Sequence, residues 1–359
     1  MSLTRRMLTA ASLAMAASSS LNGPALAKPR KPRPIVIGHR GASGERPEHT
    51  PMAYRLAIAQ GADFIEPDLC ITRDGHLVAR HENEIGGTTD IGSRAEFAAR
   101  KATKVIDGQS VTGWFTEDFT LAELKTLRAR ERLPQLRPAN TAFDGQEAIP
   151  TFAEVVAIAK AAGVGVYPEM KHPRYFASIG LPFEPRMAAA LKAEELNSRT
   201  AKVFVQCFEV GPLKTLRRLT RAPLVQLVDS EGSPADLPDV RYADMVTAAG
   251  LGAIAAYADG VGPDKSYVVP TDGERLLPAT SLVRDAHIAG LKVHPWTVRA
   301  ENYFLPKRLQ RLPASLRLDA PTFHGDVAAV LKALYEAGVD GVFSDFPGLA
   351  VAARKDMFG

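Results

Sequence analysis

Short apolar runs rich in β-branched residues alternate along this chain with stretches of helical periodicity, and that alternation limits the folds open to it. Eight such runs occur, at residues 35–38, 64–68, 163–171, 202–208, 223–228, 259–262, 291–298 and 338–346. Strands that alternate with crossover helices build a parallel sheet. Eight consecutive strand and helix units predict an α/β chain that folds as a (β/α)8 TIM barrel.

An open, doubly wound sheet is the main alternative, and it predicts a glycine-rich nucleotide loop after the first strand. The segment GHRGASGE, residues 38–45, contains three glycines, but their spacing is not G-x-G-x-x-G. The sequence therefore favours the closed barrel and argues against a dinucleotide site.

Two segments interrupt the regular alternation. Residues 83–150 are too long for a loop between a strand and a helix and too varied in composition for a linker. We expect them to form an inserted cap over the barrel mouth after strand 2, with a helix around residues 121–132. A second insertion, about residues 301–322, is rich in proline and arginine and follows the seventh strand on the same face.

Residues 1–27 have the pattern of a secretory signal peptide. Arg5 and Arg6 precede an apolar stretch, and the segment closes on Ala-Leu-Ala at residues 25–27. We predict cleavage at that point, which leaves residues 28–359 as a single domain in the periplasm or outside the cell. The paired arginines also resemble a twin-arginine signal, so export by that route or by the general route stays open.

The net charge and the two cysteines limit which binding partners and which covalent links we expect. The full chain has a formal charge of +4, and without residues 1–27 it keeps 42 basic against 40 acidic side chains. This balance predicts no nucleic-acid binding, and no stretch after the leader is apolar enough to predict a stable membrane anchor. Cys70 and Cys207 end apolar runs on strands that we place two apart. We expect separate buried thiols, although export would permit a disulfide.

Ionisable residues collect at the carboxyl ends of the predicted strands, where a barrel places its functional groups. Glu66 and Asp68 alternate along one strand and so point to the same side, and Glu169 lies on the next strand. Three carboxylates in one space repel each other unless a cation intervenes. Oxygen ligands suit Ca²⁺ or Mg²⁺ better than zinc, so we predict one such divalent cation. Ion pairs with Arg40 and Lys171 are the structural alternative.

Two histidines are placed for acid–base chemistry beside that cation. His39 ends the first strand, and His81 ends a predicted hairpin, LCITRDGHLVARH at residues 69–81, with its turn at Asp74-Gly75. With Arg40 and Lys171 to hold an anionic ester, one histidine would accept a proton from the nucleophile and the other would protonate the leaving oxygen. Either histidine alone is more typical of a structural hydrogen bond, so this prediction rests on the whole set.

These residues resemble a known family. GHRGASGERPEHTPMAYRLAIAQGADFIEPDLCITRDGHLVARHE, residues 38–82, is similar to the core motif of the glycerophosphodiester phosphodiesterases: His-Arg-Gly, Pro-Glu-Asn-Thr, Gly-Ala-Asp, Ile-Glu-x-Asp, Thr-x-Asp-Gly and a closing His. YPEMK and DGVFSDFP resemble its later motifs. VTGWFTEDFTLAELKTL and VHPWTVRAENYFLP resemble the periplasmic bacterial branch of the family.

The resemblance implies a TIM barrel that hydrolyses small glycerophosphodiesters to glycerol 3-phosphate and an alcohol. Glycerol's free hydroxyl would be the internal nucleophile, giving a cyclic phosphate that water then opens. By matching positions, the acid–base pair would be His39 and His81, and the ligands of the Ca²⁺ or Mg²⁺ ion would be Glu66, Asp68 and Glu169. The predicted substrate-binding set is Arg40, Lys171, Gln206 and Trp296, the first two holding the phosphate.

Three positions depart from the family pattern. His49 replaces the Asn of Pro-Glu-Asn-Thr, Glu82 replaces the Asp of the closing His-Asp, and Arg299 stands where many relatives have Asn. We expect the first change to remove a hydrogen bond within its loop. We expect none of the three to involve the metal ligands or the acid–base pair.

Two other functions compete with this one. A related lyase would cleave phospholipids and stop at the cyclic phosphate, but it should carry an exposed apolar rim or a basic membrane-facing patch, and neither is clear in the sequence. A non-catalytic phosphodiester-binding protein should have lost a histidine or a carboxylate, whereas every expected position is filled. The sequence predicts neither the head group nor the oligomeric state.

Overall fold

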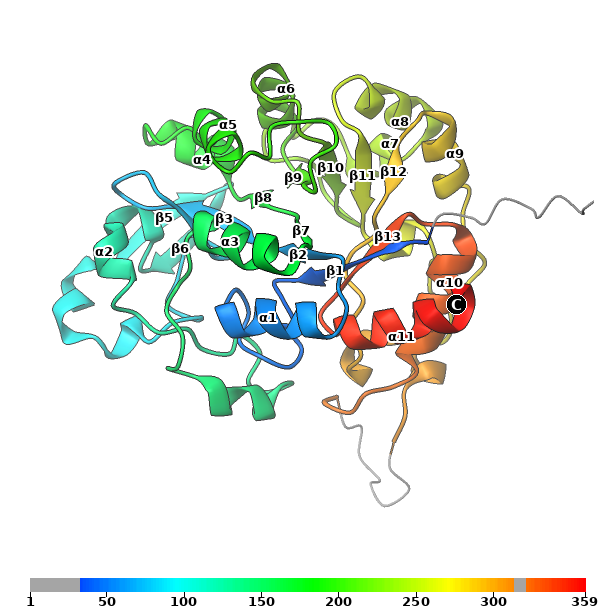
Figure 1. The fold of residues 1–359 in the computed structure, drawn as a ribbon, viewed down its shortest axis with the longest axis horizontal. Helices are drawn as coiled ribbons and strands as arrows, with labels where there is room; N and C mark the ends of the chain where they lie inside the picture. Colours follow the sequence, from blue (N-terminus) through cyan, green and yellow to red (C-terminus); the bar gives the residue numbers. More distant parts are fainter. Residues whose placement is uncertain (1–32, 313–320) are drawn as a thin grey trace, which may run out of the picture. The chain divides into compact units, whose positions relative to one another are not determined.

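Parallel strands form a closed barrel in the computed structural model, which describes residues 33–312 and 321–359 (Figure 1). The barrel strands are β1 (Ile35–His39), β2 (Phe64–Glu66) with β3 (Asp68–Ile71), β7 (Gly165–Val166) with β8 (Glu169–Met170), β9 (Val205–Cys207), β10 (Leu224–Val228), β11 (Gly260–Pro263), β12 (Lys292–Val293) and β13 (Gly341–Ser344). The predicted TIM barrel is confirmed. The predicted signal peptide lies outside the described residues.

The strands pair in sequence order, and the first and last strands close the ring. β1 pairs with both β2 and β13, and parallel pairing continues from β8 through β9, β10 and β11 to β12. Between β12 and β13, the amide of Phe343 donates to the carbonyl of Pro295 at 3.1 Å, and the amide of Val298 donates to Phe343 at 2.8 Å. The strand ends therefore face one common mouth.

Prolines interrupt two of the barrel strands. Pro67 separates β2 from β3, and Pro168 lies between β7 and β8. A proline has no amide hydrogen for the ladder, so a break at these positions is expected. The pairing resumes beyond each break, with Asp68 opposite Glu169. Glu66, Asp68 and Glu169 thus flank the two breaks.

Helices surround the barrel (Figure 1). They are α1 (Pro51–Ala59), α3 (Phe152–Ala162), α4 (Pro173–Ser178), α5 (Phe183–Ala193), α6 (Val210–Leu219), α7 (Tyr242–Met245), α8 (Ala248–Ala255), α9 (Leu282–Ile288), α10 (Val327–Ala337) and α11 (Pro347–Phe358). Thr50 and Thr151 cap α1 and α3 by accepting from backbone amides three residues on. Within the described ranges, no helix has the length and apolar character needed to cross a membrane.

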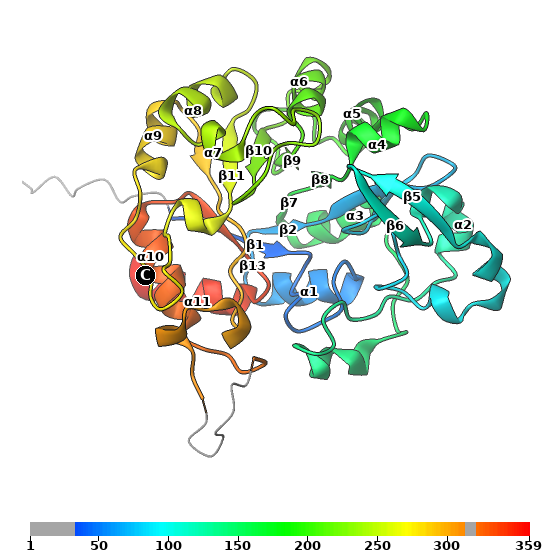
Figure 2. The ribbon, with the colours of Figure 1, turned by 180° about the vertical axis from the view of Figure 1, so that it is seen from behind.

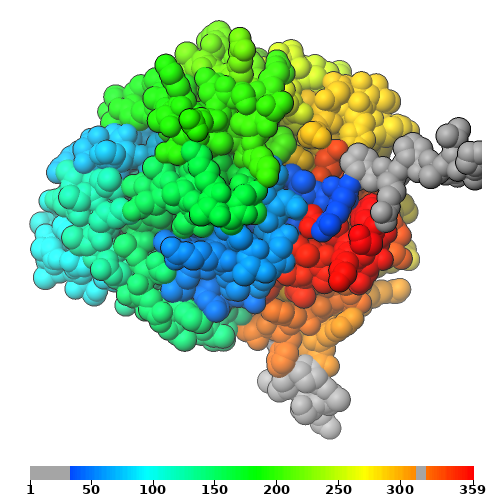
Figure 3. Space-filling view, in the orientation of Figure 1, coloured from blue at the N-terminus to red at the C-terminus, as the bar shows by residue number. Residues whose placement is uncertain are grey.

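The core has two layers. Inside the barrel, Ile37, Tyr167, Val225 and Phe343 are fully or almost fully buried. A larger apolar layer fills the space between the strands and the helices. On the outside, the segments of α1 (blue) and α11 (red) are neighbours at the surface (Figure 3). The Gln60 side chain at the end of α1 accepts from the amide of Gly348 at 3.1 Å. Cys70 and Cys207 are separate buried thiols, as predicted.

The predicted hairpin after strand 2 is present. β3 pairs antiparallel with β4 (Leu77–Ala79), and Leu69 lies opposite Ala79. Gly75, with a φ of +86°, makes the turn in a conformation that favours glycine. The chain therefore returns to the barrel mouth at His81.

The 83–150 insertion has its own short elements. They are β5 (Ala102–Ile106), β6 (Gln109–Gly113), α2 (Leu121–Leu124) and the 3₁₀ segments η1 (Ile91–Ser93), η2 (Ala95–Arg100), η3 (Thr116–Asp118) and η4 (Pro138–Phe143). The antiparallel β5–β6 pair lies beside α4, where Asp107 pairs with His172 at 2.5 Å (Figure 2).

The helix predicted around residues 121–132 is wrong beyond Leu124. The amide of Ala129 donates to Glu147 at 2.8 Å, and the amide of Arg130 donates to Thr88 at 2.9 Å. These partners lie elsewhere in the insertion, so tertiary pairing replaces the local helical bonds. In the second insertion, residues 313–320 lie outside the described ranges, and the rest includes η6 (Asn302–Phe304) and η7 (Lys307–Leu309). A further 3₁₀ segment, η5 (Lys265–Tyr267), follows β11.

Candidate active site

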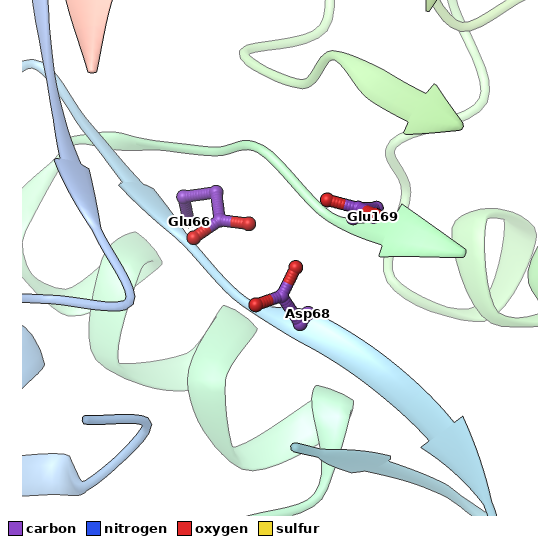
Figure 4. A group of neighbouring side chains, drawn as sticks. All are labelled: Glu66, Asp68 and Glu169. Atoms are coloured by element: carbon purple, nitrogen blue, oxygen red, sulfur yellow. The ribbon is translucent and has the colours of Figure 1, made fainter. Parts of the chain in front are cut away.

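Three buried carboxylates converge at the barrel mouth (Figure 4). Glu66 ends β2, Asp68 begins β3 and Glu169 begins β8. Each offers an oxygen, and these atoms lie within 4.8 Å of one another. The three residues are at most 6% exposed. The structure therefore brings together the three predicted metal ligands.

The electrostatics of this cluster fit a bound cation. Burial, together with the charges of Asp68 and Glu169, raises the pKa of Glu66 well above its usual range. Burial also raises the pKa of Glu169 to about 8, although Lys171 opposes the shift. Two of the three carboxyl groups would thus take up protons unless another positive charge offset their repulsion. Buried, oxygen-only ligands are what Ca²⁺ or Mg²⁺ would find here.

Arg40 and Lys171 flank the carboxylates with positive charge. The backbone amide of Arg40 donates to Glu66 Oε2 at 2.8 Å, and its guanidinium donates to Glu48 Oε2 at 2.8 Å. Its Nε lies 3.2 Å from Asp68 Oδ2. Lys171 Nζ lies 2.8 Å from Glu169 Oε1. Both predicted phosphate-binding residues are therefore at the cluster, in ion pairs that an anionic substrate could share.

His39 projects from the end of β1 and is nearly enclosed. Its Nδ1 lies 2.6 Å from Asp345 Oδ1, and its side chain is 11% exposed. Burial and the charge of Arg40 lower the pKa of His39 to about 4, despite the opposing effect of Asp345. The imidazole is therefore neutral at pH 7, and its Nδ1–H faces the carboxylate, which leaves Nε2 with the free lone pair.

His81 occupies a more open position after the hairpin. Its Nδ1 lies 2.5 Å from Glu82 Oε1, and its side chain is 28% exposed. Burial and the charges of Arg40 and Lys171 lower the pKa of His81 to about 3, although Glu82 opposes this. His81 is thus also neutral at pH 7, with Nε2 available to a substrate.

Gln206 and Trp296 differ in how close they lie to the carboxylates. Gln206 pairs with Glu169 across neighbouring strands, and its Nε2 donates to Glu66 Oε1 at 3.3 Å. Within the described residues its buried Oε1 has no hydrogen-bond partner. Trp296 donates to the Gly262 carbonyl at 2.8 Å and packs edge-on against Phe208. Gln206 therefore belongs to the carboxylate cluster, whereas Trp296 packs against Phe208 and the apolar cluster inside the barrel.

A cavity of about 330 Å³ opens beside Glu169 and Lys171. Phe208 and Tyr242 form an aromatic part of its wall. The wall also carries four acidic side chains, Asp107, Glu209, Asp229 and Glu231, and burial raises the pKa of Glu209 to about 8. Asp107 pairs with His172, Glu209 accepts from the backbone amide of Arg174, and Asp229 accepts from the backbone amide of Ser230. The cavity is therefore acidic and partly aromatic.

Two of the three departures from the family pattern, His49 and Glu82, contact a predicted metal ligand or a histidine of the acid–base pair, which corrects the expectation that none would, whereas Arg299 contacts Asp345. His49 Nε2 lies 2.9 Å from Asp68 Oδ2, and its Nδ1 lies 2.9 Å from the Tyr54 hydroxyl. His49 therefore makes two side-chain hydrogen bonds, both to residues outside the Pro-Glu-Asn-Thr motif. Glu82 binds His81 directly, and Arg299 donates from Nε to Asp345 at 3.0 Å, behind His39.

Sequence reasoning missed residues that stand behind the two histidines. Asp345 follows β13, within the motif DGVFSDFP, while Arg132 and Arg137 come from the insertion. Arg137 donates to Asp345 Oδ2 at 2.5 Å, and Arg132 donates from Nη1 to Glu82 Oε1 at 2.9 Å. The short spacing of the arginines in RLPQLRP was the only signal, and it predicted neither partner.

Comparisons with known proteins agree with this geometry. The model of the glycerophosphoryl diester phosphodiesterase family matches residues 39–349. A glycerophosphodiester phosphodiesterase of Arabidopsis thaliana is 37% identical, over 88% of this chain and 84% of that protein. One from Haemophilus influenzae is 29% identical, over 90% of each chain.

Solved structures share the fold at lower identity. An Oleispira antarctica phosphodiesterase, solved in complex with the product sn-glycerol-3-phosphate, has a TM-score of 0.58 and 21% identity, covering 90% of this chain and 97% of that one. A glycerophosphodiester phosphodiesterase from Agrobacterium tumefaciens has a TM-score of 0.56 and 18% identity, covering 89% and 99%. The chain therefore belongs to the glycerophosphoryl diester phosphodiesterase family, and it is a phosphoric diester hydrolase.

Proposed function

We propose that this enzyme hydrolyses glycerophosphodiesters to glycerol 3-phosphate and an alcohol by acid–base catalysis with His39 and His81, in the presence of one divalent cation. The observation that carries the proposal is the meeting, at one barrel mouth, of three buried carboxylates with two neutral imidazoles and the cations Arg40 and Lys171. Membership of the family supports the same reaction class.

The reaction would proceed in two balanced steps. In the first, one histidine takes the proton from the glycerol hydroxyl next to the phosphate, and that oxygen bonds to phosphorus. The other histidine, neutral in the free site, takes up a proton from water as the anionic phosphate binds beside it, and the alcohol leaves with that proton. In the second, water opens the cyclic phosphate while the histidines exchange roles. Arg40 and Lys171 orient the phosphate oxygens throughout and offset their growing charge.

Glu66, Asp68 and Glu169 would hold the cation, with Gln206 beside them. When bound, Ca²⁺ or Mg²⁺ supplies a positive charge that polarises the phosphate. The ligand types suit either ion, because both bind carboxylate oxygens and differ in coordination number and rigidity.

The acidic cavity beside Lys171 would receive the leaving alcohol. Its carboxylates and aromatic rings favour a cationic head group, such as choline or ethanolamine, over a neutral or anionic one. Trp296, which packs on Phe208, would support that wall.

A coupled assay for glycerol 3-phosphate release from glycerophosphocholine tests the reaction. We expect EDTA to abolish activity, Ca²⁺ or Mg²⁺ to restore it, and His39→Ala to remove it. Activity that survives both chelator and substitution would overturn the mechanism. Comparing glycerophosphocholine with glycerophosphoglycerol tests the cavity, and equal kcat/KM values would contradict its role.

The same reaction, followed by ³¹P NMR, separates hydrolysis from the lyase alternative. Hydrolysis ends in glycerol 3-phosphate, whereas a lyase would accumulate the cyclic phosphate. A protein that binds the diester but releases neither product would fit the non-catalytic alternative.

We also propose that the mature enzyme works in the periplasm or outside the cell. The support is the leader pattern of residues 1–27. Mass spectrometry of the protein purified from cell fractions tests this, and an intact N-terminus in the cytoplasmic fraction would contradict it.

A further inference from the structure

Each histidine of the site is paired with a carboxylate: His39 with Asp345 and His81 with Glu82. Each of these carboxylates also accepts a hydrogen bond from an arginine of the 83–150 insertion. Arg137 is 7% exposed and donates from Nη2 to Asp345 Oδ2 at 2.5 Å. It also donates from Nε to Glu301 at 2.6 Å and from Nη1 to the Ser43 carbonyl at 3.0 Å. Since Asp345 Oδ1 faces His39, this arginine occupies the other oxygen of the same carboxylate.

Arg132 binds Glu82, the carboxylate that is paired with His81. Its Nη1 donates to Glu82 Oε1 at 2.9 Å and its Nη2 to Oε2 at 2.5 Å. On its other side it grips both oxygens of Glu48, at 2.8 and 2.7 Å, and Glu48 in turn accepts from Arg40. One guanidinium therefore links the carboxylate behind His81 to the carboxylate that holds Arg40.

We propose that the insertion is a positioning element of the active site, in which Arg132 and Arg137 fix the carboxylates that orient His81 and His39. The inference rests on the proposed function of the two histidines. Both arginines bind the carboxylates that face the histidines, so each acts through another residue and is a positioning residue.

The chemistry of the arginine fork explains why these contacts matter. A carboxylate held by one partner can rotate, whereas a guanidinium with two fixed N–H groups sets the plane of the carboxylate. A fixed carboxylate oxygen then selects the imidazole tautomer with the proton on Nδ1 and aims Nε2 at the mouth. A small misplacement of a reacting group can lower a rate on the order of 100-fold.

The two carboxylates differ in how many arginines hold them. Asp345 also accepts from Arg299, at 3.0 Å, so His39 keeps one support if Arg137 is lost. Glu82 has Arg132 as its arginine partner, and its side chain is 37% exposed. We therefore expect Arg132→Gln to impair catalysis with little loss of stability, and Arg137→Gln to lower both.

Kinetics and NMR of the full mature enzyme test this inference. For Arg132→Gln we expect kcat to fall on the order of 100-fold with KM little changed. Arg132→Lys should recover only part of the rate, because a lysine cannot form the fork. Long-range ¹H–¹⁵N spectra should show an altered tautomer balance at His81 in the Arg132 variants and at His39 in Arg137→Gln.

Arg94→Gln is the matched control. Arg94 lies in the same insertion and binds Glu96 at 2.9 Å and the Thr126 carbonyl at 3.0 Å, both within the insertion. Its substitution should leave kcat and both histidine spectra unchanged. If Arg137→Gln does not fold because Glu301 is left buried and unpaired, the double variant Arg137→Gln/Glu301→Gln removes that charge.

A folded Arg132→Gln with wild-type kcat and an unchanged His81 spectrum would overturn the inference. So would an equal loss in Arg94→Gln, because it would assign the effect to a loosened insertion. Failure of the proposed function has a different signature: the wild type would release no glycerol 3-phosphate, while the histidine spectra would still report whether the arginines set the tautomers.

Discussion

His39 and His81 use the same chemical device in two different settings. His39 ends a barrel strand, and its carboxylate partner, Asp345, lies 306 residues away on the neighbouring strand end. His81 follows a hairpin outside the barrel ring, and its partner is the next residue, Glu82. The first pair is nearly enclosed, whereas the second has side chains that are 28% and 37% exposed.

This difference in burial should determine whether a substitution at each pair lowers the stability of the protein or only its activity. A buried charge network must be complete, because a lone charge left inside the protein costs several kcal/mol. An exposed pair contributes little to stability, since water solvates either partner when the other is lost. Substitutions on the His39 side should therefore affect folding and activity together, and those on the His81 side mainly activity.

The largest expected effect is the loss of either histidine. His39→Ala and His81→Ala should each lower kcat by roughly 10²- to 10⁴-fold, the usual contribution of a general acid or base. His81 lies closer to the charge of Lys171, which lines the cavity for the leaving alcohol. We therefore expect His81 to be the acid, acting after it takes up a proton beside the bound anionic phosphate.

A substrate with a 4-nitrophenol leaving group tests that assignment. This alcohol leaves without protonation, so His81→Ala should recover most of its rate and His39→Ala should not. Equal recovery in both variants, or recovery only in His39→Ala, would contradict the assignment.

Replacing the two carboxylates tests the contrast in stability. Asp345→Asn should lower the free energy of unfolding by about 3–5 kcal/mol, because it leaves Arg137 and Arg299 without their buried partner. Glu82→Gln should cost at most about 1 kcal/mol. Urea unfolding of both variants gives the comparison, and similar losses would show that exposure does not distinguish the two sides.

The fold was predictable because its signals are local or repeat along the chain. The eight apolar runs and the Asp74-Gly75 turn each follow from a few neighbouring residues. The predicted site residues could be grouped because a barrel brings its strand ends together. The substrate-binding role of Trp296 stays a prediction, and the residue packs on Phe208, which lines the cavity beside Lys171.

The rest depends on contacts between distant segments, which a periodic pattern does not contain. Arg132 and Arg137 lie in an insertion without regular periodicity, so their partners became visible only in three dimensions. The helix predicted to reach residue 132 failed for the same reason, since Ala129 and Arg130 pair with other parts of the insertion. The role of His49 was missed because its imidazole reaches across to Asp68 on another strand.

The pH dependence of stability gives a smaller effect with a definite sign. His39 has a pKa of about 4 in the folded protein against an ordinary value of 6.5, so between these values the unfolded chain binds more protons. Stability should therefore fall as the pH drops from 6.5 towards 4, and His39 should contribute at most ~3 kcal/mol to that loss.

His39→Gln should flatten this pH dependence, measured by urea unfolding in EDTA, more than His81→Gln does. Although the pKa of His81 is lowered to about 3, its side chain is more exposed, so water can solvate its charged form. A steeper pH dependence in His39→Gln than in the wild type would reverse the predicted sign.

The smallest expected effect concerns His49, a third imidazole near the site, which differs from His39 and His81 because both of its ring nitrogens are hydrogen-bonded within the protein. Both of its nitrogens are occupied, by Asp68 and by the Tyr54 hydroxyl, and the residue is fully buried. It therefore has no free Nε2 for substrate, and its effect should pass through the orientation of Asp68. His49→Asn, which restores the residue of the family motif, should change cation affinity by roughly tenfold and kcat less.

Calorimetric titration of the EDTA-treated protein with CaCl₂ or MgCl₂ measures this affinity, with Tyr54→Phe as the second variant. Tyr54→Phe removes the hydroxyl but keeps the ring, so it should shift cation affinity in the same direction as His49→Asn and by less. A loss of activity in His49→Asn as large as that of His39→Ala would place His49 among the catalytic histidines. In that case, hydrogen bonds to both ring nitrogens could not be used to distinguish a positioning histidine from a reacting one.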